Sequence, residues 1–435
     1  MDGVANLASQ QAWRVARALS GRILAQSESG GNANSVWSPA CVANLLAVAR
    51  EGSAGATRWE LDALLGDGDL LVEPDPFDVE RKPAWGYDGY EASSATAAWL
   101  SKLATPSDAF LRKCDECGVH VSVDDLGDPR VSREVSAWIS EKTRGLLSPA
   151  ISLSSVALAC LVSALYLKDA WADPFEEYLT NRALFHAEDG GVRVAFMHDE
   201  RCCRVIDGDD CVAFGMPLSS DAEMLFTLPN SGGDHMGEAL ELFERLSCGE
   251  GERELVELGI PRFECETTIP DLGMQLEAAG VYSASAMNLV PMVGVEPTPT
   301  QVIHGAKLSI DEKGVEAGAY TIMIACAGCP PENPPEPRKI TLNRPFYVAV
   351  ASRTGAPLFV GQSLCHRLPG GGAQVVPRGV ASFDAALPGY SFHWCFFMST
   401  QPLSRKATPS SVSSARWSGK LGARRPAWLT TRWHG

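Results

Sequence analysis

Apolar residues follow a helical spacing in several segments of the first half of the chain. The opening "MDGVANLASQQAWRVARALS" predicts an amphipathic helix. Ser38 and Pro39 begin a second helix, because serine caps a helix N-terminus and proline is tolerated in the first turn. Residues 130–148 predict a third helix with Trp138 and Ile139 on its buried side.

After residue 155 the pattern changes to short apolar or alternating runs, which are typical of strands. These runs are "VALACLVSALYL", "GVRVAFM", "CVAFGMPL", "EMLFTLPN" and "ELVELGIPRF", followed by "KLSIDEKG" and "PFYVAVASRTGAPLFVGQ". The last run predicts a hairpin that turns at Thr354 and Gly355, and "IPDLGMQLEAAGV" predicts a helix ending at Gly280. Helices first and strands later, without regular alternation, indicate an α+β fold and not a doubly wound parallel sheet.

Residues 314–329 combine strand character with an abrupt end. They contain no proline and one charge, Glu316, and five prolines follow in the eight residues from Pro330. In a strand, alternate side chains face the same side. One row is small or apolar throughout: Val315, Ala317, Ala319, Thr321, Met323, Ala325 and Ala327. The segment is therefore able to enter a sheet, whereas the proline-rich part lacks ladder donors; the alternative is an ordinary surface loop.

The charge of the chain says more about its possible partners than its composition does. The 435 residues are 45 % hydrophobic and 21 % charged, as in ordinary globular domains, and the formal net charge is −16. Residues 401–435 hold seven basic residues and no acid, which leaves 30 basic and 53 acidic residues, or −23, in residues 1–400. This charge disfavours binding of the domain to nucleic acid or to an acidic membrane. No apolar run reaches the roughly 18 residues of a membrane span.

Residues 366–435 are rich in Ser, Arg, Gly, Pro and Trp and show no period, so we expect a disordered basic tail after a folded domain of residues 1–365. Trp417, Trp428 and Trp433 stand near arginines and would fit a nucleic-acid or partner contact. An extension without a selected role is the favoured interpretation.

The thirteen cysteines are scattered and odd in number, which favours reduced thiols over a disulfide framework. Cys114, Cys117 and His120 offer three zinc ligands, and Cys202 and Cys203 could add a fourth. Nothing completes that pattern, so we favour ordinary cysteines and expect neither a metal site nor a cofactor. The usual hydrolase, zinc-protease and phosphate-loop motifs do not occur, and no catalytic residues or enzyme activity are expected.

Six segments, in order, resemble the serpin family. They are "SVWSPACVANLLAVAREGSAGATRWEL", "LVSALYLKDAWADPFEEYLTNRALFH", "LFTLPN", "LGIPRFECETTIPDLGMQLEAAGV", "IHGAKLSIDEKGVEAGAYT" and "ITLNRPFYVAV". Any one would be weak, but six in order over residues 10–365 make a specific match. The resemblance implies a serpin-like α+β fold of the bacterial, intracellular type, with several helices packed on three β-sheets and an exposed reactive loop over residues 312–340.

The resemblance also implies a mechanism. A serine or cysteine protease cuts the loop and forms an acyl-enzyme, and the cut loop then inserts as a strand into the main sheet of a metastable fold. The implied hinge comprises Glu312, Gly314, Val315, Glu316, Ala317, Gly318, Ala319 and Thr321. Inhibitory members usually carry Thr or Ser at the Val315 position, although a β-branched valine suits a strand. The implied reactive bond, Gly328–Cys329, lies among small residues, so we expect a target protease with a small primary pocket, of elastase or subtilisin type.

A further implied feature is the shutter, a hydrogen-bonded cluster beneath the centre of the main sheet. Its members here are Ser38, Cys41, Ser163 and His304. The family usually has Ser at the Cys41 position and Asn at the Ser163 position. A thiol is a poor donor, and serine reaches less far than asparagine. We therefore expect a weaker shutter and a less secure closed sheet.

Two functions stay open: a suicide-substrate protease inhibitor, or a non-inhibitory serpin-fold protein that binds a ligand or partner. The inward hinge row carries no bulky, charged or proline residue, which favours inhibition. Cys326 and Cys329 flank the reactive bond, and a disulfide there would block it, although two free thiols are the favoured interpretation. Asp2 stands where a secretory signal carries positive charge, so we expect a cytoplasmic monomer, with secretion by an unrecognised route as the alternative.

Overall fold

The computed structural model describes residues 2–29, 34–66, 91–154, 156–187, 190–269, 271–296, 298–315, 336–363 and 375–376. Within these ranges the helices are α1 (Asp2–Ser29), α2 (Pro39–Glu51), α3 (Gly55–Leu65), α4 (Asp108–Glu116), α5 (Pro129–Lys142), α6 (Met236–Ser247), α7 (Gly273–Ala278) and α8 (Val290–Val293), with a 3-10 turn, η1 (Glu177–Leu179). The strands are β1 (Asn34–Trp37), β2 (Glu91–Ser101), β3 (His120–Asp124), β4 (Ala159–Ala170), β5 (Asn181–Ala187), β6 (Gly190–Asp207), β7 (Cys211–Pro217), β8 (Glu223–Pro229), β9 (Glu252–Pro261), β10 (Phe263–Ile269), β11 (Ala286–Met287), β12 (Thr298–Asp311), β13 (Gly314–Val315), β14 (Arg338–Thr341), β15 (Phe346–Ala351), β16 (Pro357–Ser363) and β17 (Val375–Val376).

The described strands form two hydrogen-bonded sheets, and with the helices they confirm the α+β fold. The smaller sheet has the order β10-β12-β13-β4-β2-β3, with β11 beside β12, and β12 also pairs directly with β4. The larger sheet has the order β1-β16-β15-β8-β7-β6-β9-β14, and β5 and β17 also pair with β6. Three separate sheets were expected, but the described strands form two. The strand β6 makes the larger one continuous, because it pairs with β5 over its first half and with β7 over its last residues.

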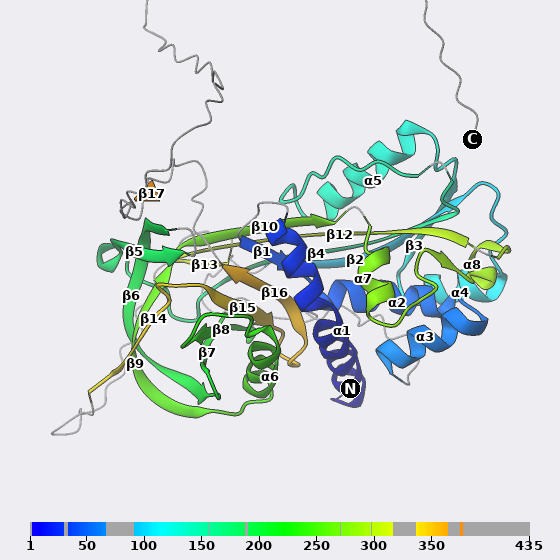
Figure 1. The fold of residues 1–435 in the computed structure, drawn as a ribbon. Helices are drawn as coiled ribbons and strands as arrows, with labels where there is room; N and C mark the ends of the chain where they lie inside the picture. Colours follow the sequence, from blue (N-terminus) through cyan, green and yellow to red (C-terminus); the bar gives the residue numbers. More distant parts are fainter. Residues whose placement is uncertain are drawn as a thin grey trace, which may run out of the picture. The chain divides into compact units, whose positions relative to one another are not determined.

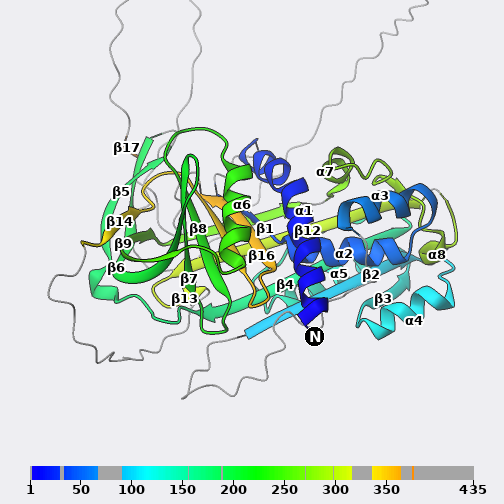
Figure 2. The same ribbon diagram turned by 90° about the horizontal axis from the view of Figure 1, so that it is seen from below.

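Each face of the smaller sheet has its own cover (Figure 1). The strand period of two places alternate residues on opposite faces. Residues packed with α5 on one face include Trp99, Cys160, Val162 and Ile303. Residues packed with α1 and α2 on the other face include Ala98, Leu100, Leu161 and Val302. Farther along this second face, Leu165, Leu167, Leu308 and Ile310 join a core shared with the larger sheet. The ribbon seen from below shows α1 and α2 in front of the smaller sheet (Figure 2).

Several elements match the sequence-based predictions. The N-terminal helix is α1, and Ser38 caps α2 by accepting a hydrogen bond from the backbone N of Cys41. The hairpin is β15 and β16, with Gly355 at a φ of 82° in its turn. The third helix, α5, ends at Lys142 and not at residue 148, because Arg144 and Gly145 take positive φ values of 51° and 82°.

The predicted tail lies outside the described residues except for Val375 and Val376, which pair with β6. Among the described helices, none combines the length and the apolar character needed to cross a membrane.

Candidate functional site

The smaller sheet changes its pairing along the junction of β4 and β12. At one end the two strands pair in parallel, Thr300–Ile303 against Ala159–Val162. At the other end β13 lies between them and is antiparallel to both. Val315 stands opposite Ile310 on β12 and opposite Asp169 on β4. The chain thus turns back after β12 and begins a new strand inside the sheet.

Gly314 is required at the start of this new strand. Its φ is +145°, a conformation that residues with a Cβ rarely adopt. A Cβ added there would lie 2.3 Å from the carbonyl oxygen of Asp169 and 2.5 Å from the Cα of Ala170. Both atoms belong to the backbone of β4, so neither moves without distorting the strand. Only glycine lets the chain approach β4 this closely.

Glu312 anchors the turn that precedes β13. It is only 3 % exposed, and its carboxylate accepts hydrogen bonds from the Nε of Arg262 at 2.9 Å, from the Nη2 of the same side chain and from the hydroxyl of Thr180. Burial alone would raise the pKa of Glu312, but these hydrogen bonds more than offset it and hold the pKa below its usual value. The carboxylate therefore stays charged and bonded at neutral pH.

Trp171 holds the same turn from the end of β4. Its indole Nε1 donates to the carbonyl of Asp311 at 2.8 Å, and its backbone N donates to the carbonyl of Lys313 at 3.1 Å. Beside it, the buried carboxylate of Asp169 accepts hydrogen bonds from the backbone N and the hydroxyl of Ser220. These contacts fix both chains that flank the first residues of β13.

Val315 is buried in the core between the two sheets, with 2 % exposure. It is the first member of the small, apolar row predicted for residues 314–329. Leu308 and Ile310 of β12 and Leu167 of β4 belong to the same core. The row therefore begins on the buried face of the sheet.

The four predicted shutter residues lie together beneath the same junction. The backbone N of Ser38 donates to Nε2 of His304 at 3.0 Å, and the Ser38 hydroxyl accepts from the backbone N of Cys41 at 3.2 Å. The hydroxyls of Ser38 and Ser163 lie near the Cys41 thiol and act to lower its pKa. Since Nε2 of His304 is an acceptor, the imidazole is neutral. Their contribution to sheet opening stays a prediction.

Burial sets the protonation of this cluster. It lowers the pKa of His304 to about 4 and raises the pKa of Cys41, with the hydroxyls of Ser38 and Ser163 opposing the second shift. Both groups are therefore uncharged at neutral pH, in contrast to the ionised Glu312. Thr96 also belongs here, because its hydroxyl lies 3.4 Å from that of Ser163. The sequence alone does not reveal Thr96, since its place depends on the pairing of β2 with β4.

The shutter marks the point where the direct pairing of β4 and β12 ends. The last pair is Ile303 with Val162, and His304 and Ser163 are the next residues. A pocket with about 460 Å³ of empty space, partly open to solvent, lies at this point. It is lined by Ile139, Leu147, Ser148 and Pro149 from α5 and the segment after it, by Val162, Ser163 and Ala164, by Glu266 and Thr268, and by Ile303, His304 and Gly305.

The remaining predicted site residues fall in 316–335, outside the described residues. They are Glu316, Ala317, Gly318, Ala319 and Thr321 of the hinge, and Gly328 and Cys329 of the reactive bond.

The C-x-x-C-x-x-H pattern does not close into a metal site. Cys114 is buried in α4, whereas His120 is exposed and packs its ring edge-on against Trp99 at 5.7 Å. Within the described ranges, one group of three side chains lies close enough to hold a metal ion, and it is Cys211, His235 and Glu238. This group was not predicted from the sequence, because its members are brought together by the packing of α6 on the larger sheet.

Known proteins resemble the chain over most of its length. A family model for serpins, described as serine protease inhibitors, matches residues 15–365. An uncharacterized serpin-like protein of Thermococcus kodakarensis is 27 % identical over 357 residues, which cover 77 % of this chain and 81 % of that protein. Serpin-ZX of Arabidopsis thaliana is 25 % identical over 369 residues, which cover 76 % of this chain and 92 % of that protein.

Solved structures of serpins share the fold. The thermophilic serpin tengpin in its native state gives a TM-score of 0.69 at 20 % identity, covering 83 % of this chain and 94 % of that chain. AtSerpin1 of Arabidopsis in its native stressed conformation gives 0.67 at 23 % identity, covering 84 % and 98 %. With the family match over residues 15–365 and the sheet that admits β13 between β4 and β12, these likenesses establish that the chain belongs to the serpin family.

Proposed function

We propose that this serpin is a suicide-substrate inhibitor of serine proteases, which traps the acyl-enzyme by inserting its cut loop between β4 and β12. Members of the family are generally protease inhibitors and not enzymes. The observation that carries the proposal is β13. Its two residues, Gly314 and Val315, already occupy the first two positions of a strand between β4 and β12. Glu312, bonded to Arg262 and Thr180, keeps this start of the strand in place.

The register of β13 extends in a consistent way. Val315 is opposite Ile310 and Asp169, and in an antiparallel strand each later residue pairs with one earlier residue on each neighbour. Six residues on, Thr321 would stand opposite His304 on β12 (310 − 6) and opposite Ser163 on β4 (169 − 6). Counting along β12 and counting along β4 therefore both place Thr321 at the shutter.

Insertion would therefore proceed in two stages. Residues 316–321 would enter the part of the junction where no direct β4–β12 pair is formed, whereas residues 322–325 would have to separate the four pairs from Ile303–Val162 to Thr300–Ala159. Position 327 would reach Thr298, the first residue of β12. The two new ladders, at roughly 0.5–1.5 kcal/mol per hydrogen bond, would contribute on the order of ten kcal/mol. That gain is comparable with the roughly 5–15 kcal/mol stability of a protease domain, which distortion of the trapped protease must overcome.

The surroundings of the inserted row suit its side chains. Ala317 would lie between Leu308 and Leu167, both buried in the core between the sheets. Thr321 would bring a hydroxyl to the polar shutter cluster, where a hydrogen-bonding group is favoured over an apolar one. The small residues of the loop thus match the space that the register assigns to them.

We also assign the reactive bond to Gly328–Cys329 and the target to a serine protease with a small primary pocket. The residues before the bond, Ala325 to Gly328, are small apart from the thiol of Cys326, and none is basic. A deep acidic pocket would find no arginine or lysine there. A shallow pocket of elastase or subtilisin type would accept them.

The test is incubation of the full chain with elastase-like, subtilisin-like and trypsin-like proteases, followed by denaturing electrophoresis and mass analysis. The proposal predicts a covalent complex with the small-pocket proteases and a released fragment that begins at Cys329. Cleavage without a complex at any ratio would contradict inhibition and favour a serpin-fold protein that binds a ligand or partner. A complex whose fragment begins elsewhere would overturn the assignment of the bond and leave the mechanism intact.

A further inference from the structure

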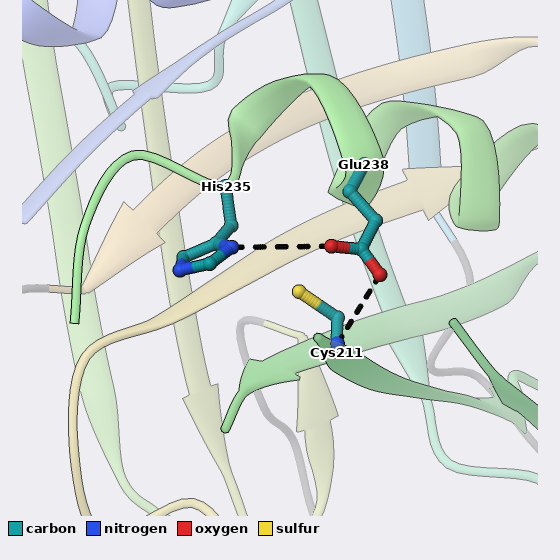
Figure 3. Close-up of side chains that lie close together, drawn as sticks. All are labelled: Cys211, His235 and Glu238. Atoms are coloured by element: carbon teal, nitrogen blue, oxygen red, sulfur yellow. Dashed lines mark hydrogen bonds and ion pairs between the residues drawn. The ribbon is translucent and has the colours of Figure 1, made fainter. Parts of the chain in front are cut away.

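Cys211, His235 and Glu238 meet where α6 packs on the larger sheet (Figure 3). Cys211 is the first residue of β7, His235 directly precedes α6, and Glu238 lies in the first turn of that helix. One ligand atom from each residue lies within 4.8 Å of the other two. The three atoms differ in kind: a sulfur, an imidazole nitrogen and a carboxylate oxygen.

The spacing is close to that of a metal site. Zinc binds sulfur at about 2.3 Å and nitrogen or oxygen at about 2.1 Å in a tetrahedron, so its ligand atoms lie about 3.4–3.8 Å apart. Nδ1 of His235 is already 3.9 Å from Oε2 of Glu238. Figure 3 shows the sulfur of Cys211 pointing toward the space between the imidazole and the carboxylate. The three side chains would need to close by only about 1 Å to reach zinc distances.

Backbone groups hold Glu238 in this position. Its Oε1 accepts hydrogen bonds from the backbone N of Asp210 at 3.0 Å and of Cys211 at 3.2 Å, which leaves Oε2 toward His235. Gly208 makes room for the carboxylate, because a Cβ at that position would lie 2.3 Å from Oε1. The carboxylate is thus oriented by the turn between β6 and β7, independently of any ion.

The imidazole is oriented from its other side. Nε2 of His235 lies 3.6 Å from a carboxylate oxygen of Asp210, and that oxygen accepts a hydrogen bond from the hydroxyl of Ser231. The backbone N of His235 donates to the hydroxyl of Tyr347 at 3.0 Å. A carboxylate facing the second nitrogen of a ligating histidine fixes the ring and its tautomer. Asp210 lies near this nitrogen, and the hydroxyl of Ser231, 3.5 Å from Nε2, is within hydrogen-bonding distance of it.

We propose that Cys211, His235 and Glu238 bind a zinc ion, with water as the fourth ligand. The His235 and Glu238 side chains are 15 % and 23 % exposed, so the site is reachable from solvent, whereas Cys211 is buried. Binding releases the thiol proton to solvent as the sulfur–metal bond forms. Thiolate and imidazole select zinc over the hard, oxygen-seeking magnesium and calcium ions. The hydrogen bonds to the turn between β6 and β7 account for Glu238 alone, and they require neither the thiol nor the imidazole.

The ion would join the start of β7 to the start of α6. It would stabilise the native state by binding that state more tightly than the unfolded chain. This effect is separate from protease inhibition, because none of the three residues lies in β4, β12 or β13.

The test uses the full chain, freed of metal by chelation and kept reduced, with Co²⁺ as a spectroscopic substitute for zinc. We expect one equivalent to give a thiolate-to-cobalt charge-transfer band and the intense visible bands of tetrahedral Co²⁺. Zn²⁺ should displace the cobalt, Mg²⁺ should not, and Zn²⁺ should raise the melting temperature by a few degrees. The Cys211→Ser variant should lose the charge-transfer band. The Cys248→Ser variant, which removes an exposed thiol instead, should keep it.

Because Cys211 is buried and its replacement disturbs packing, Glu238→Gln provides the second variant. The amide oxygen still accepts the backbone hydrogen bonds, while zinc affinity should fall at least about tenfold, as for loss of a metal ligand or its support. The proposal is overturned if the charge-transfer band is absent from the wild-type protein or persists in Cys211→Ser. It is equally overturned if Glu238→Gln binds zinc as tightly as the wild type.

Discussion

The two ends of the β4–β12 junction differ in chemistry as well as in pairing. At the hinge end, the ionised Glu312 is bonded to Arg262 and Thr180, and β13 already separates the strands. At the shutter end, a neutral cluster around His304 lies beside four direct strand pairs. In the proposed mechanism, the start of insertion would be held by charged contacts, whereas its progress would be opposed by weaker, uncharged ones.

We infer that the hinge end anchors the start of β13 and that the shutter end keeps β4 and β12 paired. Charge-assisted hydrogen bonds to buried groups are among the stronger contacts in proteins, which suits an anchor. A thiol and a short serine hydroxyl make weaker contacts, which would suit a closure that opens in the proposed mechanism.

The largest expected effect follows cleavage of the loop. Nicking between Ala325 and Pro330 with a non-target protease should allow insertion and add a central strand. The gain of on the order of ten kcal/mol should raise the melting temperature by roughly 10–15 °C. Thermal unfolding of cut and uncut protein measures it. An unchanged melting temperature would mean that the junction does not admit the loop beyond β13.

A charge in the inward row should block insertion near the hinge. Ala317→Arg would place a guanidinium between Leu308 and Leu167, and burial of an unpaired charge costs several kcal/mol. The yield of covalent complex should fall at least about tenfold, and the variant should be cleaved as a substrate.

The matched control is Glu316→Arg. The same register places this residue in the other row, beside the partly exposed Ser309 and Lys168, so complex formation should persist. Equal loss in both variants would show that the assignment of the rows is wrong.

Gly314→Ala tests the hinge end alone. The added Cβ meets the backbone of β4 at 2.3 Å, and the φ of +145° is strained for alanine, so we expect a loss of about 2–3 kcal/mol and slower complex formation. Gly237→Ala in α6 is the control, because nothing lies within 4 Å of its added Cβ. Chemical denaturation and stopped-time gels measure both effects. A Gly314→Ala variant as stable and as fast as the control would refute the docked hinge.

The pH dependence tests the shutter end. Burial lowers the pKa of His304 from 6.5 to about 4, so the unfolded chain binds more protons than the folded one between these values. The contribution of His304 is fully present above pH 6.5 and is lost as the pH falls toward 4. Between pH 7.5 and 5 the free energy of unfolding should drop by about 2 kcal/mol through this group. His304→Gln should remove that part of the drop in urea titrations, and an identical slope in both proteins would contradict the assignment.

Local sequence signals account for much of the fold. The capped start of α2, the apolar run of β4 and the hairpin of β15 and β16 are each defined by neighbouring residues, and all three were predicted. The helix α6 was missed, because His235 provides no side-chain cap to mark its beginning. The end of α5 was placed too late, because its positive φ values are set at Arg144 and Gly145 within a polar, helix-compatible stretch.

The site depends on pairings that the sequence does not encode locally. The resemblance identified Ser38, Cys41, Ser163 and His304, but it gave no register and so could not place Thr96 or relate Thr321 to the shutter. The contact of Cys211 with Glu238 joins residues 27 positions apart through the turn before β7. Such long-range register becomes visible only once the strands are aligned.

The most direct test of loop insertion is a disulfide that holds β12 against β4. Gln301 stands opposite Cys160 in the paired section, where neighbouring strands lie about 4.8 Å apart, a separation that a disulfide spans. Gln301→Cys, once oxidised, should tie β12 to β4 below the shutter and stop insertion near position 321. Gln301→Ser under the same oxidising conditions is the control, because it loses the same amide contacts without forming the bond.

The measurement is the yield of covalent complex with a small-pocket serine protease, before and after reduction, with the disulfide verified by mass. We expect oxidised Gln301→Cys to be cleaved without forming the complex, and reduction to restore its yield to that of Gln301→Ser. A full yield of complex with the disulfide intact would contradict insertion of the loop between β4 and β12.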